Sequence, residues 1–110
     1  MKIKKGASLN GLQISMRPAL IVCDSVLRGL GKELVITSGT DGEHSAGSLH
    51  YYGLAFDIRI RHLDDIEKKT LYRRLQMQLS SLGFQVIIHH THIHIEFDEV
   101  KNGRSSSFIE

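Results

Sequence analysis

The residues best suited to chemistry lie near the C-terminus, in the stretch HHTHIHIEFD that runs from His89 to Asp98. This stretch contains four of the seven histidines of the chain. If it forms a strand, its side chains alternate, so His92, His94 and Glu96 project to one face and the hydrophobic residues between them to the other. Two imidazoles on one face can converge on a metal ion. A strand end that carries solvated histidines is the alternative.

Two further candidates for metal ligation lie upstream, in HYYGLAFD. His50 lies near the end of the glycine-rich segment 39–54, a kind of long loop that is usually functional, and six residues separate it from Asp57. Asp57 stands between Phe56 and Ile58 in an alternating segment, so its carboxylate lies beside a core and needs a cation, a metal or several N–H donors. A salt bridge to Arg59 or Arg61 is the alternative to a metal.

Two histidines and one aspartate that leave a fourth position open form the ligand set of a catalytic zinc site. Zinc would lower the pKa of a bound water to about 7 and polarise a carbonyl group. The remaining histidines of the cluster are candidates for the general base that such chemistry needs. Because Cys23 is the single cysteine, a thiolate-cluster site is excluded, and Cys23 itself is expected to be a small buried residue.

ITSGTDGEHSAGSLHYYGLAFDI followed by HHTHIHIEFD resembles the zinc D-Ala-D-Ala metallopeptidase group. This group includes bacterial D,D-carboxypeptidases, murein endopeptidases and small phage-encoded cell-wall peptidases, and it shares its fold with the hedgehog signalling domain. The chain matches every fixed position of the first motif of the group, S-x-H-x-x-G-x-A-x-D, with Ser48, His50, Gly53, Ala55 and Asp57. The second motif is H-x-H, and its second histidine here is His94. The resemblance extends from about residue 14 to residue 98.

The resemblance implies a role for each residue of the two motifs. One Zn²⁺ ion would be bound by His50, Asp57 and His94, with water in the fourth position. His89, five positions before the last ligand, would accept the proton of that water, and His92 would stabilise the oxyanion or share the role of base. Ser48 would hold the substrate or orient His50.

Four residues around the motifs have less defined roles. Glu96 is expected to be either a solvated residue or a group that orients a ligand. His62 and His90 are expected to be surface residues, and the role of His44 is open.

One departure from the group bears on specificity. Many carboxypeptidases of the group have an arginine after the Ser-Gly of TSG, whereas this chain has Asp41 at about that point. Since a C-terminal carboxylate needs a guanidinium partner, this favours an endopeptidase, although Arg17 or Arg59 could reach the site from elsewhere. The expected activity is therefore zinc-dependent cleavage of peptidoglycan stems or crosslinks. The alternatives are a non-catalytic, zinc-stabilised binding domain of hedgehog-like fold and a non-haem iron oxygenase.

The elements that must position these residues can be predicted from periodicity. A helix is expected over 16–31, with Pro18 in its first turn, and a second begins at a capping box of Asp64 and Glu67 and ends at Gly83. Strands are expected over 33–38, 55–60, 84–88 and 92–97. This order predicts an α+β fold: a small antiparallel sheet with helices packed on one face. The apolar stripe of the second helix comprises Leu71, Leu75, Leu79 and Leu82.

Length and composition set the remaining expectations. The chain has 110 residues, a formal charge of +2 and 41% hydrophobic residues, which is typical of one globular domain over 1–110 and does not indicate nucleic-acid binding. No apolar run approaches the roughly 20 residues that span a bilayer, and no secretory signal is evident. We therefore expect a monomer that acts on the cell wall after release from the cytoplasm, as a phage lysis enzyme does.

Overall fold

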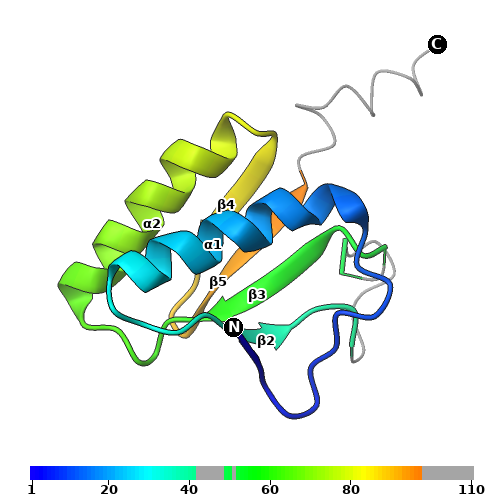
Figure 1. Cartoon of the computed structure of the whole chain (residues 1–110), viewed down its shortest axis with the longest axis horizontal. Helices are drawn as coiled ribbons and strands as arrows, with labels where there is room; N and C mark the ends of the chain where they lie inside the picture. The colour runs from blue at the N-terminus through cyan, green and yellow to red at the C-terminus, as the bar shows by residue number, and fades with distance from the viewer. Residues whose placement is uncertain (42–48, 51, 98–110) are drawn as a thin grey trace.

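The computed structural model describes residues 1–41, 49–50 and 52–97, which form an α+β domain with one five-stranded sheet (Figure 1). The order of the strands across the sheet is β1-β2-β3-β5-β4. Their bounds are β1 Lys2–Ile3, β2 Val35–Ser38, β3 Ala55–Arg59, β4 Phe84–Ile88 and β5 His92–Phe97. The four predicted strands are present, within two residues of the expected bounds.

The sheet is mixed, so the prediction of an antiparallel sheet was wrong at one edge. β2, β3, β5 and β4 pair antiparallel, but β1 pairs parallel to β2. Two backbone hydrogen bonds hold this edge: Lys2 N–H donates to the carbonyl of Leu34 at 2.8 Å, and Lys4 N–H to that of Ile36 at 2.9 Å. Two residues are too short for a periodic pattern, which explains why the sequence did not predict this strand.

Both helices lie on the same face of the sheet (Figure 1). α1 (Arg17–Gly29) follows a 3-10 turn at Ile14–Met16 and has proline in its first turn. α2 (Asp65–Ser80) begins with the predicted capping box, in which the side chains of Asp64 and Glu67 each accept a hydrogen bond from the backbone N–H of the other. The described residues include no helix long and apolar enough to cross a membrane.

The core lies between the sheet and the helices. The predicted stripe of α2 is buried at Leu71, Leu75 and Leu79, but Leu82 is 50% exposed, because the helix ends at Ser80 and the chain turns away through Gly83, whose φ is +91°. Cys23 is fully buried, as expected, and burial raises the pKa of its thiol far above its usual range. The strands contribute Ile36, Phe56, Ile58, Phe84, Val86, Ile93 and Ile95 to this core.

The pairing of β3 with β5 determines which polar side chains meet on the face of the sheet away from the helices. Cross-strand partners are Asp57 with His94 and Arg59 with His92. Because side chains alternate along a strand, the buried Phe56 and Ile58 fix these polar residues on the face away from the helices. The alternation predicted for both strands is thereby confirmed, and it gathers the candidate ligands on one surface.

Candidate metal centre

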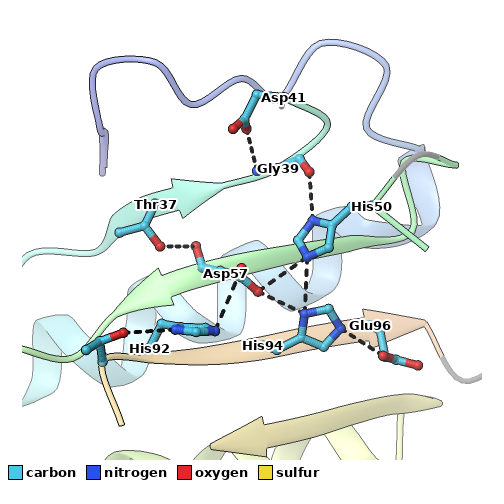
Figure 2. Close-up of polar contacts among 9 residues, drawn as sticks. Thr37, Gly39, Asp41, His50, Asp57, His92, His94 and Glu96 are labelled. Carbon is cyan, nitrogen blue, oxygen red and sulfur yellow. Dashed lines mark hydrogen bonds and ion pairs between the residues drawn. The ribbon is translucent and has the colours of Figure 1, made fainter. Parts of the chain in front are cut away.

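Three predicted ligands, His50, Asp57 and His94, meet in the structure (Figure 2). Asp57 and His94 are neighbours on β3 and β5, and His50 approaches from the segment that connects β2 to β3. One ligand atom from each residue lies within 4.8 Å of the others. His50 is the single buried polar or charged residue among those described, at 6% exposure. The group can bind a metal ion.

Hydrogen bonds on the outer side of each imidazole fix which nitrogen faces the centre. Nδ1 of His50 lies 2.7 Å from the carbonyl oxygen of Gly39, which can only accept, so this nitrogen donates and Nε2 faces inward. Nε2 of His94 lies 2.8 Å from Oε1 of Glu96 and donates to it, so Nδ1 faces inward. A carbonyl or carboxylate behind a ligating histidine is the usual arrangement in metal sites, because it fixes the ring and makes the inward nitrogen more basic.

Three ligand atoms therefore converge, and either a metal ion or a shared proton must lie between them. Oδ1 of Asp57 lies 2.8 Å from Nδ1 of His94 and 3.5 Å from Nε2 of His50, and the two nitrogens are 3.2 Å apart. Around a tetrahedral zinc ion with bonds of about 2.0 Å, neighbouring ligand atoms are about 3.3 Å apart. The three distances bracket this value, so the residues fit a zinc ion, and a proton would otherwise have to bridge them.

The charges of the group are consistent with this need for a cation. Burial opposes ionisation of Asp57, but hydrogen bonds and positive charge from His50 and His94 outweigh it, so the pKa of the Asp57 carboxyl lies well below its usual range. Burial also disfavours the charged form of His94. The carboxylates of Asp57 and Glu96 outweigh this effect and raise the pKa of His94. Both carboxylates thus stabilise positive charge on the ring of His94.

Glu96 and Asp57 resolve two alternatives that the sequence left open. Glu96 accepts a hydrogen bond from His94 and so orients a candidate ligand. The ion pairs of Asp57 within the described part of the chain are with His50, His92 and His94, and none is with Arg59 or Arg61. The salt-bridge alternative for Asp57 is therefore not what the structure shows.

Of the predicted catalytic residues, His92 lies beside Asp57, and His89 contacts His92. Nε2 of His92 is 4.0 Å from Oδ2 of Asp57, and Nδ1 of His92 is 3.1 Å from the hydroxyl of Thr91. The ring of His89 stacks on that of His92 with centroids 4.7 Å apart, and His89 N–H donates to the carbonyl of His92 at 2.8 Å. Partial burial lowers the pKa of His92 despite the nearby Asp57. This shift favours the neutral form of His92, which can accept a proton.

The position of His50 depends on the segment before α1, which the sequence did not indicate. Oδ1 of Asp41 accepts hydrogen bonds from Gly39 N–H at 2.7 Å and from Ser8 N–H at 2.8 Å. Thr40 N–H donates to the carbonyl of Ser8 at 2.8 Å. Asp41 thus connects Ser8 to Gly39, the glycine whose carbonyl orients His50. It stands at about the position where many carboxypeptidases of the group have an arginine.

Residues 11–13, which also precede α1, support the other end of the connection between β2 and β3, at Gly53. Gln13 N–H donates to the carbonyl of Gly53 at 2.9 Å, and a Cβ atom at Gly53 would lie 2.2 Å from the carbonyl oxygen of Gly11. Gly53 also has a φ of +69°, which only glycine adopts easily. The motif glycine is therefore required by backbone packing beside His50.

Other predicted residues do not join the group. His90 is exposed, and exposed His62 lies 3.2 Å from the carbonyl oxygen of Glu33. Ser48, predicted to contact substrate, and His44 lie outside the described residues.

Gly39→Ala should weaken metal binding, because its Cβ would lie 2.1 Å from the carbonyl oxygen of Ser8 and displace the carbonyl that orients His50. We expect zinc affinity to fall by at least tenfold, measured by competition with a chromophoric chelator. Gly29→Ala, where nothing lies within 4 Å of the added atom, is the matched control. Equal affinities in the two variants would contradict the role assigned to Gly39.

Zinc affinity should decrease as the pH falls, because a proton competes for Nδ1 of His94. Since the pKa of His94 is raised, this competition begins at a higher pH than it would for an ordinary imidazole. Glu96→Gln retains an acceptor for Nε2 but removes the charge, so the pH at which half of the zinc is released should move downward. Chelator competition over pH 5–8 measures it. An unchanged midpoint would show that Glu96 does not act on His94.

None of the protein-family models, curated proteins or solved structures compared with this chain matches it. Membership of the zinc D-Ala-D-Ala metallopeptidase group therefore stays a prediction from the two motifs. The placement of His50, Asp57 and His94 around one point is a property of the structure itself.

Proposed function

We propose that the protein is a zinc-dependent peptidase that hydrolyses peptide bonds of peptidoglycan stems or crosslinks. The observation that carries this proposal is the convergence of His50, Asp57 and His94 with a fourth histidine, His92, whose Nε2 lies 4.0 Å from Oδ2 of Asp57. A site that only stabilises the fold is normally closed by four protein ligands. Three protein ligands with a further histidine beside them, a candidate base, are the features of a hydrolytic zinc site.

A bound zinc ion would polarise the substrate carbonyl and lower the pKa of a water molecule to about 7. The remaining steps fall to the residues of this chain. His92, which is partly exposed and lines a pocket together with Asp57, accepts the proton of the attacking water and returns it to the leaving amine. In this proposal His89, whose ring stacks on that of His92, shares this proton or takes the role of base when substrate is bound.

Asp41 supports an endopeptidase rather than a carboxypeptidase. Its carboxylate already accepts two backbone N–H groups, so this part of the connection is built to hold His50 rather than to bind a terminal carboxylate. The resemblance to murein endopeptidases, which carry H-x-x-H-x-H as His89, His92 and His94 do here, points to the same class.

The decisive experiment is a mass-spectrometric map of the products from purified peptidoglycan incubated with the zinc-loaded protein. We expect new amino termini from cleaved peptide bonds, and no products with excess chelator. If zinc raises the melting temperature of the protein but no wall preparation is hydrolysed, the result would contradict the peptidase function and support the non-catalytic binding domain.

Substitution of the histidines should separate binding from catalysis. His94→Ala should lose zinc, because it removes a ligand. His92→Ala and His89→Ala should keep zinc, and at least one should lower kcat by about 10²- to 10⁴-fold, the usual contribution of a general base. His90→Ala, an exposed neighbour, is the control for the cluster. Wild-type rates in both His89→Ala and His92→Ala would exclude this pair as the source of the base.

A further inference from the structure

A pocket of about 260 Å³ lies next to the metal centre, on the same face of the sheet. Asp57 and His92 form the wall that it shares with the centre. The pocket crosses the sheet from the end of β1, over β2 and β3, to the start of β5. Its other charged lining residues are Lys4, Arg59 and Arg61.

Three cations therefore face one pocket whose only carboxylate, Asp57, belongs to the metal centre. The lysine and arginine ion pairs of the described residues are Arg28 with Asp24 and Lys32 with Glu67, and neither involves a cation of the pocket. The hydroxyl groups of Thr37 and Thr91 add neutral hydrogen-bonding capacity. The pocket is thus positively charged and polar, which suits a small anion.

Arg59 is fixed relative to the metal centre by the sheet. It lies two residues from Asp57 on β3, on the same face, and opposite His92 on β5. Its side chain is half-buried, so less freedom is lost when it binds than for an exposed arginine. Asp57 and Arg59, two residues apart on the strand, are separated by about 7 Å. Two residues of an extended peptide substrate span about the same distance.

We propose that this pocket binds a free carboxylate of the peptide substrate, about two residues from the bond that is cleaved. The inference rests on the proposed peptidase function and adds a requirement for substrate charge. A carboxylate accepts two parallel hydrogen bonds from a guanidinium group, which Arg59 and Arg61 can both supply. For an endopeptidase this carboxylate is a side branch within the stem peptide, and the test distinguishes it from the C-terminal carboxylate.

The test compares wild type with Arg59→Gln and Arg61→Gln on synthetic stem peptides. In one set the internal carboxylates are amidated, and in another the terminal one. Arg59→Gln should raise KM by roughly ten- to a hundredfold for the peptide with the recognised carboxylate free, the usual effect of a hydrogen bond to a charged group. The peptide amidated at that carboxylate should already bind wild type weakly and should be unaffected by the substitution. Whichever amidation weakens wild type identifies the source.

Two controls separate this pocket from the metal centre. Arg74→Gln removes an exposed cation of α2, which packs on the opposite face of the sheet, and should change neither parameter. Zinc content should be unchanged in all three variants, because none removes a ligand. Equal losses on free and amidated peptides would overturn the proposal.

A binding measurement makes the outcome independent of catalysis. Acetate is titrated into the zinc-loaded protein while the side-chain N–H resonances of Arg59 and Arg61 are followed by NMR. Saturable shifts that Arg59→Gln abolishes support the anion pocket even if no peptide is cleaved, and in that case the peptidase proposal alone fails. Shifts confined to the histidines would show that acetate binds only at the metal, which would overturn the pocket.

Discussion

The antiparallel pairing of β3 with β5 is the interaction on which the candidate site depends. It places Asp57 opposite His94 and Arg59 opposite His92, while Phe56, Ile58, Ile93 and Ile95 are buried under the helices. A slip of one residue on either strand would move a charged residue into the core and a hydrophobic one to the surface. The free energy of core burial therefore fixes the register, and the register fixes the distance between two ligands.

The third ligand is positioned differently, since it lies on no strand. His50 is buried between the sheet and a backbone carbonyl, and that carbonyl is held by Asp41 and by the segment around Ser8. Two glycines, Gly39 and Gly53, allow this segment to approach closer than any side chain would permit. The site thus combines a rigid pair of strand residues with a loop residue that the N-terminal segment supports.

The sequence predicted those features that follow from local periodicity or from residue type. Alternation on β3 and β5 separated core from polar face, and the capping box located α2. The two motifs that resemble those of the zinc D-Ala-D-Ala metallopeptidase group indicated that His50, Asp57 and His94 form one site. Features created by contacts between distant segments were not predictable in this way. The two-residue β1 has no pattern, and nothing in the sequence around Asp41 indicates that it would bond to Ser8.

Leu82 shows that periodicity can also predict burial where none occurs. It continues the spacing of Leu71, Leu75 and Leu79 but lies beyond the end of α2, so the helical geometry that buries the others no longer applies to it. Like strand β1, the pocket lined by Lys4 and Arg59 could not be predicted from local sequence patterns. Both require residues near the chain start to lie beside the central strands.

The long separations between the ligands have a consequence for folding. His94 meets Asp57 across 37 positions of the chain and His50 across 44. Closing loops of this size costs conformational entropy, and the long-range contacts that offset this cost form late in folding. The three ligands therefore come together only when the sheet is nearly complete. A metal ion bound by all three would then favour the native state over partly folded ones and stabilise it in proportion to the logarithm of the free metal concentration. The ion would act as a late cross-link between two strands and the loop, and metal occupancy would report that the domain has finished folding.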